Sequence, residues 1–278
     1  MRNMRWTARA LLAAAITVTV AVSPVQAAPV AAPPAPDPAA RQLEPGQAYL
    51  GWDSRPTAAA TADPRSSVVA PAASVVYGID VSGWQGNVNW ASWWNAGFRF
   101  AYVKATEGTG YTNTYFTQQY NGSYNQGFIR GSYHFALPNK SSGATQADYF
   151  VNHGGGWSRD GKTLPGVLDI EFNPYGATCY GLSQASMRSW ISSFTSRYKS
   201  RTGRDAVIYT NTSWWKSCTG NSGAFGSTNP LWVANYATST PPLPAGWGYY
   251  TFHQYTSSPL DKDKFNGSSA RLKALALG

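Results

Sequence analysis

Short apolar stretches alternate with segments of helical period along residues 75–210. The stretch VVYGIDVS (75–82) is rich in β-branched residues, and the segment that follows it opens with Asn89 and closes with Gly97, which are typical helix ends. The repeated pattern predicts strands at 75–82, 98–106, 128–135, 163–171, 205–210, 230–236 and 248–256, and helices at 89–97, 113–127, 142–153 and 183–203.

Alternation of strands and helices is typical of a parallel sheet with helices outside it. With about eight strand candidates, we predict the α/β class and a single closed (β/α) barrel. About 200 residues is short for eight complete repeats, so some helices should be missing. Helical signals fade after residue 210, where 230–236 and 248–256 have only loops between them. We therefore expect the missing helices in the C-terminal third.

The N-terminus has the pattern of an export signal. Arg2, Arg5 and Arg9 precede an apolar stretch at 10–22, and VQA at 25–27 is a small-residue cleavage site. The alternative is a membrane anchor, but this stretch falls short of the ~20 residues that a spanning helix needs. We predict a signal peptide at 1–27 and a secreted, extracellular protein with no membrane association once the signal is removed.

Residues 28–74 are rich in alanine and proline and contain few residues that could pack. We interpret them as a linker or pro-segment, with the folded domain at 75–278. On this interpretation, deleting 28–74 should leave both the melting temperature and the activity nearly unchanged.

The chain contains two cysteines, Cys179 and Cys218, and neither lies in a nucleophile motif. In an oxidising compartment a disulfide is expected, although two buried thiols are the alternative.

Charge and aromatic content bear on the partner. Residues 75–278 contain 16 basic and 9 acidic residues, a net charge of +7, which favours anionic polymers such as those of cell walls. The basic residues form no run, so we expect no nucleic-acid partner. The 12 Trp and 17 Tyr could stack on sugar rings or fill the core.

Two carboxylates close the apolar run at 163–171. In Leu168-Asp169-Ile170-Glu171 the two acids alternate with apolar residues, so on a strand they share one face, about 6.6 Å apart. Such a pair can keep one member protonated as a general acid while the other stays charged, which glycoside hydrolysis needs. The alternative is two solvated acids at a strand end.

Asp80 also ends an apolar strand, and a helix cap or an Asx turn would explain it equally well. The three histidines, His134, His153 and His253, are too dispersed for a metal motif, and His134 fits a structural role best. We predict no metal and no cofactor. Walker, G-x-S-x-G and dinucleotide-binding motifs are absent from the sequence, which argues against nucleotide and serine-hydrolase chemistry.

Six ordered blocks make residues 75–278 resemble glycoside hydrolase family 25, the Chalaropsis-type lysozymes, and most of all its secreted Streptomyces members. The blocks are YGIDVSGWQG (77–86), FAYVKATEG (100–108), IRGSYHF (129–135), ADYFVNHGGGWSRDGKTLPGVLDIE (147–171), CYGLS (179–183) and DKDKFNGSSARL (261–272). The resemblance implies an incomplete barrel. It also implies cleavage of the β-1,4 bond between N-acetylmuramic acid and N-acetylglucosamine in bacterial peptidoglycan, by a protein that we expect to be a monomer.

The resemblance also implies roles for particular residues. Glu171 would be the general acid with Asp169 as its partner, and Asp80 a third acid in the groove. Asp261 would be a fourth, in a block where Asp263 competes for the same place in the alignment. Substrate contacts are expected from Tyr133 and Tyr209.

Two mechanisms remain open. The substrate's acetamido group could act as the nucleophile, oriented by Asp169, or a water molecule could attack with inversion, for which about 6.6 Å is the lower limit of carboxylate spacing. Two other functions also remain: a non-catalytic wall-binding module, which would not need four acids, and a wall amidase or endopeptidase, which would need a metal motif.

Overall fold

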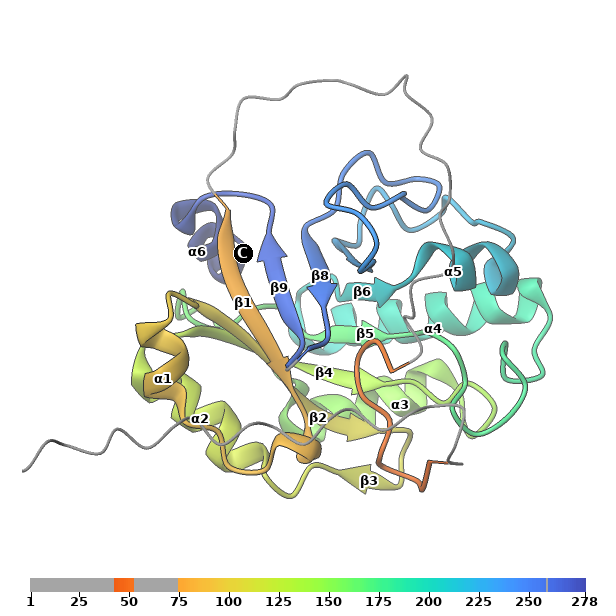
Figure 1. Ribbon diagram of the computed structural model, residues 1–278. Coiled ribbons are helices and arrows are strands. Elements are labelled where there is room, and N and C mark those ends of the chain that lie inside the picture. The colour runs from red at the N-terminus through yellow and green to blue at the C-terminus, as the bar shows by residue number, and fades with distance from the viewer. Residues whose placement is uncertain (1–42, 53–74, 259) are drawn as a thin grey trace, which may run out of the picture. The chain divides into compact units, whose positions relative to one another are not determined.

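The computed structural model describes residues 43–52, 75–258 and 260–278 (Figure 1). The predicted signal peptide and most of the Ala/Pro-rich segment lie outside these residues. The described strands are β1 (Val76–Val81), β2 (Phe100–Glu107), β3 (Tyr111–Thr112), β4 (Ile129–Phe135), β5 (Val167–Asp169), β6 (Val207–Thr210), β7 (Leu231–Ala234), β8 (Phe252–Thr256) and β9 (Lys262–Phe265).

Eight of these strands close into a ring. Its order is β1-β9-β8-β7-β6-β5-β4-β2, and β1 pairs with β2 to close it, while β3 is a short antiparallel addition to β2. All neighbours in the ring are parallel except β9, which is antiparallel to both β8 and β1. The predicted closed barrel is confirmed.

Helices cover the outside of the ring (Figure 1). They are α1 (Trp90–Asn95), α2 (Phe116–Gln126), α3 (Gly143–Phe150), α4 (Gln184–Thr202), α5 (Thr212–Thr219) and α6 (Ser269–Leu277), with a 3₁₀ turn at Gly83–Gln85 and a π-turn at Val151–Gly155. Among the described residues, no helix lies between β7 and β8 or between β8 and β9, as the C-terminal prediction required. None of the described helices is long and apolar enough to cross a membrane.

The helices α5 and α6 and the strand β9 are among the elements that the sequence prediction missed. α5 contains Trp, Ser, Thr and Cys, which are weak helix formers, and it is stabilised by burial of Trp214, Trp215 and Cys218. α6 has a regular N-cap at Ser268, so the expectation that helical signals end after residue 210 was wrong. β9 has the sequence Lys-Asp-Lys-Phe, and its pairing with β1 and β8 decides its conformation.

Side chains alternate across the barrel wall. On β5, Val167 belongs to the cluster inside the barrel, whereas Leu168 and Ile170 pack outward against the helices. On β1, Ile79 and Val81 belong to an outer cluster under α1 and α2. This alternation directs Asp80, Asp169 and Glu171 into the barrel.

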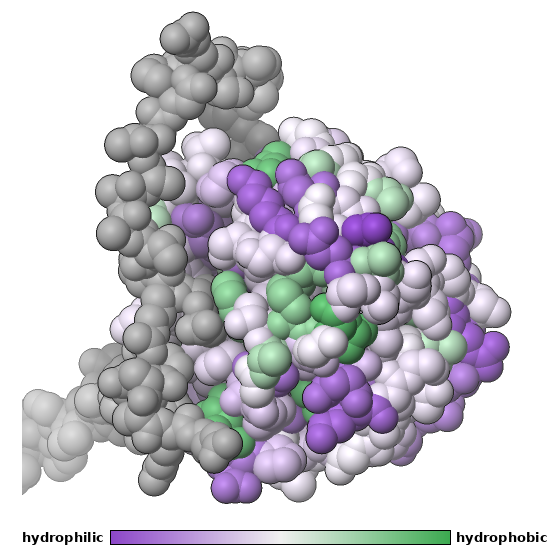
Figure 2. Space-filling view, turned by 90° about the vertical axis from the view of Figure 1, so that its right-hand side faces the viewer, coloured by the Kyte–Doolittle hydropathy of each residue, from purple (hydrophilic) through white to green (hydrophobic). Residues whose placement is uncertain are grey.

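The face of the molecule that carries α5 is largely polar. Figure 2 shows a small group of hydrophobic residues near its centre, surrounded by neutral and hydrophilic ones. The buried apolar residues of α4 and α5 belong to a core cluster beneath these helices.

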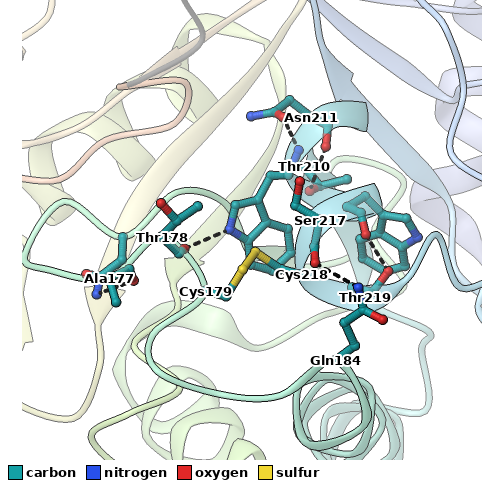
Figure 3. Close-up of a disulfide and its surroundings, with 12 residues drawn as sticks. Ala177, Thr178, Cys179, Gln184, Thr210, Asn211, Ser217, Cys218 and Thr219 are labelled. Carbon is teal, nitrogen blue, oxygen red and sulfur yellow. Dashed lines mark hydrogen bonds between the residues drawn. A yellow bond between two sulfur atoms is a disulfide. The ribbon is translucent and has the colours of Figure 1, made fainter.

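Cys179 and Cys218 form a disulfide, as the composition predicted (Figure 3). It links the loop after β5 to α5, and the indole N–H of Trp214 donates a hydrogen bond to the carbonyl of Thr178 at 3.1 Å beside it. The two contacts fix the loop that carries the chain away from the acid pair.

Candidate active site

The carboxyl ends of the parallel strands bring buried polar side chains together inside the ring. Asp80 lies near the end of β1, Asp169 ends β5, and Gln254 lies on β8. Because β9 runs antiparallel, its beginning lies at the same edge, which adds Asp261 and Asp263. The residues come from distant parts of the sequence and meet through closure of the barrel.

The acid pair of β5 faces the barrel interior. Asp169 and Glu171 are both fully buried. The strand is assigned only as far as Asp169, yet the N–H of Ile170 still donates to the carbonyl of Tyr209 at 3.0 Å. This bond continues the strand geometry, so both carboxyls lie on one face, as predicted.

Asp169 and Glu171 influence each other's ionisation. Burial raises the pKa of Asp169 well above its usual range, while the Lys104 ammonium and Glu171 act to lower it. Two neighbouring carboxyl groups in a buried site resist being ionised together, so one of them holds a proton more readily than an isolated carboxyl does.

Asp80 and Asp263 form a second carboxyl pair. Burial raises the pKa of Asp80 to about 7, against hydrogen bonds with Gln254 and Asp263 that lower it. The amide of Gln254 donates to Asp80 Oδ2 at 2.8 Å, and the indole of Trp232 donates to Asp263 Oδ1 at 3.1 Å. The pair is therefore held from two sides and carries a proton at mildly acidic pH.

Asp261 lies directly before β9 and is almost fully buried. Its backbone carbonyl accepts a bond from the N–H of Asp80 at 3.4 Å, and its pKa is raised by burial and by the charges of Asp80 and Glu171. Asp261 and Asp263 both belong to the acid cluster. The sequence prediction named Asp261 and left out Asp263.

Three tyrosines surround the acids. The hydroxyl of Tyr209 donates to Gln254 Oε1 at 2.8 Å, and so does that of Tyr236, which the sequence prediction missed. Tyr133 is buried inside the barrel, where burial and then the charges of Asp80 and Asp169 raise its pKa well above the usual range. The predicted substrate contacts Tyr133 and Tyr209 thus lie among the acids.

A buried ion pair stands beside this cluster and was also missed. Lys104 Nζ lies 2.6 Å from Glu107 Oε2, and both side chains are excluded from solvent. Desolvation lowers the pKa of Lys104, and Glu107 opposes that shift. Tyr175 donates to the second oxygen of Glu107 at 2.6 Å. Glu107 ends a buried strand within the FAYVKATEG block, and this position at a strand end could have identified it as a site residue from the sequence.

His134 lies outside the acid cluster. Its ring lies among Phe194 and Phe150, and its nitrogens are 2.7 Å from Thr106 Oγ1 and 2.9 Å from Gln146 Oε1. Burial lowers its pKa to about 4. It is a structural histidine between the barrel and its helices, as expected.

Residues 43–52 lie against the acids. The N–H of Gly51 donates to Glu171 Oε1 at 2.7 Å, and Leu43, Ala48 and Leu50 are buried. The expectation that residues 28–74 contribute little packing was therefore wrong for these ten residues. Their sequence, LEPGQAYLGW, contains the apolar residues that the Ala/Pro-rich flanks lack.

A closed β/α barrel with a buried carboxyl pair at its carboxyl end has what glycoside hydrolysis requires. The family model described as "Glycosyl hydrolases family 25" matches residues 79–263. The chain belongs to this family.

Named relatives and solved structures agree with that assignment. The chain is 51% identical to "Lysozyme M1" of Streptomyces globisporus over 96% of this chain and 92% of that one, and 51% identical to the "N,O-diacetylmuramidase" of Chalaropsis sp over 73% and 100%. The crystal structure of the bacterial lysozyme from Streptomyces coelicolor is 56% identical, with a TM-score of 0.71 over 73% of this chain and 97% of that one.

Proposed function

We propose that the protein is a secreted lysozyme that hydrolyses the β-1,4 bond between N-acetylmuramic acid and N-acetylglucosamine in bacterial peptidoglycan. The observation that carries the proposal is the carboxyl pair Asp169 and Glu171, fully buried on one face at the end of β5. The pair separates a proton donor from a charged partner, which is the division of labour that glycoside cleavage needs.

Glu171 acts as the general acid. Its carboxyl transfers a proton to the glycosidic oxygen as the bond from that oxygen to the anomeric carbon breaks, and the leaving sugar departs as an alcohol. In the substrate-assisted scheme, Glu171, now a carboxylate, then takes a proton from the incoming water molecule, whose oxygen bonds to the anomeric carbon as the bond to the acetamido oxygen breaks. In the inverting scheme, Asp169 takes the proton of the water, and exchange with solvent returns a proton to Glu171. Either cycle consumes one water.

Asp169 stabilises the positive charge that develops on the sugar ring. In the substrate-assisted scheme, charged Asp169 also accepts a hydrogen bond from the N–H of the 2-acetamido group, and the carbonyl oxygen of that group attacks the anomeric carbon. In the inverting scheme, the same carboxylate activates the water molecule. The anomeric configuration of the first product distinguishes the two, since the former retains it and the latter inverts it.

The remaining groups form the substrate groove in this proposal. Asp80, Asp261 and Asp263 provide buried acceptors, and Tyr133 and Tyr209 provide hydroxyls for the sugars. The net charge of +7 on residues 75–278 favours association with anionic cell walls outside the cell.

Replacing the proposed acid tests the function. Glu171→Gln keeps the shape of the side chain but removes the transferable proton, so turnover should fall by a factor on the order of 10²–10⁴ with little change in wall binding. Asp205→Asn is the matched control, because Asp205 pairs with exposed Lys199 at the surface. Near-normal turnover in Glu171→Gln would remove this residue from the mechanism.

A further inference from the structure

Residues 43–52 lie beside β3 and the end of β5 (Figure 1), against the acids where the proposed function places the substrate. One part of this segment bonds near the end of β2, where the N–H of Gly46 donates to Glu107 Oε1 at 2.9 Å. Another part bonds beyond β5, where the N–H of Gly51 donates to Glu171 Oε1 at 2.7 Å. The segment thereby spans the two acids, which are 64 residues apart in the sequence.

The segment is held along its length. Lys104 Nζ donates to the carbonyls of Gly46, at 3.1 Å, and Ala48. The indole of Trp84 donates to the carbonyl of Gln47 at 2.6 Å, and the indole of Trp52 donates to the carbonyl of Phe172 at 2.8 Å. These bonds supply partners to backbone groups that would otherwise be buried without them. The barrel therefore binds residues 43–52 as it would bind a peptide ligand.

Two glycines show how closely it fits. Gly51 has φ +78°, and a Cβ atom there would come within 2.3 Å of the Tyr236 hydroxyl, 2.4 Å of Gln254 Oε1 and 2.9 Å of the Tyr209 hydroxyl. Gly46 has φ +92°, and its Cβ would lie 2.3 Å from the ring of Tyr111. Only glycine meets both the backbone and the space requirements at these positions.

The segment uses the groups that the substrate would use. Glu171, Tyr209 and Gln254 contact it or lie against it, and its Tyr49 side chain lies near enough to Asp261 and Glu171 for their charges to act on its hydroxyl. N-acetylated sugars present amide N–H and C=O groups, as a peptide backbone does. A groove built for acetamido groups can therefore bind this peptide, and both cannot occupy it together.

We propose that residues 43–52 are a built-in competitive inhibitor of the barrel's groove, and that cleavage of the chain between Trp52 and Val75 activates the enzyme by releasing them. Covalent attachment holds the segment near the groove at an effective concentration on the order of 1 mM, so even weak binding keeps the groove filled. After cleavage the segment dissociates and is diluted. The inhibitory role rests on the proposed function, because it is defined by glycan cleavage.

The barrel does not need the segment for closure. Its ring of strands is complete within residues 76–265, and the Chalaropsis relative is matched over its whole length by 210 aligned residues, 73% of this chain. A chain of residues 75–278 is therefore a suitable uninhibited reference.

The test compares the chain from residue 28 with its Gly51→Gln variant, which should expel the segment. Initial rates on isolated cell walls should rise at least tenfold in the variant and approach those of residues 75–278. Gly97→Gln is the matched control, because Gly97 also has positive φ (+96°) but faces open space, and its rate should equal the parent's. A specific protease site inserted after Ala60 should activate the parent on cleavage and leave Gly51→Gln unchanged.

A binding measurement separates this proposal from the proposed function. A synthetic peptide of residues 43–52 is titrated into residues 75–278 by calorimetry, beside the same peptide with Gly51→Gln, which should bind at least tenfold more weakly. If residues 75–278 are inactive but bind the peptide, the proposed function fails, while the binding of residues 43–52 to the barrel is still supported. If the parent is as active as residues 75–278 before cleavage, or both peptides bind alike, the inhibitor proposal is overturned.

Discussion

The carboxyl groups of the cluster differ in what surrounds them, and this difference assigns their roles. Burial and neighbouring negative charges raise the pKa of both Asp169 and Asp261, but only Asp169 has opposing contributions, from the Lys104 ammonium and from Glu171. A charge next to a proton donor is the arrangement that keeps the donor protonated. These contacts support the roles proposed for the pair.

We predict that Asp169→Asn slows the enzyme and moves the basic limb of the pH–rate profile to lower pH. The charge of Asp169 holds the proton on Glu171, so a neutral amide at that position lets the proton leave at lower pH. The profile should be measured with residues 75–278, so that residues 43–52 do not compete. A basic limb that stays in place would show that Asp169 does not control this proton.

We predict that Asp80→Asn stabilises the fold increasingly as the pH rises from about 4 to about 7. The unfolded Asp80 ionises near pH 4, but burial raises the pKa of the folded one to about 7, so the folded state binds the extra proton in that window. The parent therefore loses stability there as the pH rises, and a non-titrating Asn does not. The difference should grow by on the order of 1–3 kcal/mol.

Urea unfolding of the parent and of Asp80→Asn at pH 4, 5.5 and 7.5 measures this difference. Asp205→Asn, at an exposed surface pair, serves as the control and should show little change across the range. A stability difference for Asp80→Asn that is the same at all three pH values would contradict the assigned pKa.

At the scale of elements, loops fix the site as much as strands do. β5 is only three residues long, and the chain beyond it carries Glu171 and then the loop that contains Cys179. The disulfide to Cys218 anchors that loop to α5, on the outside of the barrel (Figure 3). A covalent link therefore supports the strand end that holds the proposed acid.

We predict that the double variant Cys179→Ala and Cys218→Ala is less stable by about 3–4 kcal/mol, the loss expected for a closed loop of this length. Its melting temperature should fall, and its activity below that temperature should fall less than in Glu171→Gln. Free-thiol titration of the denatured, unreduced parent should find none. Two reactive thiols per chain would contradict the disulfide.

The sequence predicted elements whose own pattern decides their conformation. The alternation at 163–171 placed Asp169 and Glu171 on one face, the apolar run at 75–82 placed Asp80 at a strand end, and glycines marked the ends of three of the four predicted helices. β9 could not be predicted from its pattern, because alternating lysines give no apolar run. Its partners in β1 are 183 to 189 residues away in the sequence, and those in β8 lie across a turn. Pairing partners decide such a strand.

The site residues that the sequence prediction missed were missed for one common reason. Lys104, Gln254 and Tyr236 are single residues that no motif or periodic pattern marks in the sequence, and they become a site only when the ring closes around them. Residues 43–52 form no helix or strand that a periodic pattern could reveal. Their fit depends on the finished groove, so composition alone suggested a linker.

At the scale of the whole molecule, the protein combines a rigid barrel, an acid cluster at one end and a segment of its own chain within that end. Family membership and the acid pair lead to one reaction, the hydrolysis of a glycosidic bond in the cell wall. The two other functions considered predict different products. A wall-binding module would cleave no bond, and a wall amidase or endopeptidase would cleave amide bonds.

Chemical analysis of digested cell walls tests the central claim most directly. Walls treated with residues 75–278 should lose turbidity and gain new reducing ends on N-acetylmuramic acid, with no increase in free amino groups, and Glu171→Gln should abolish nearly all of the gain. New free amino groups without new reducing ends, or binding to walls without any cleavage product, would contradict the assignment of this barrel as a muramidase.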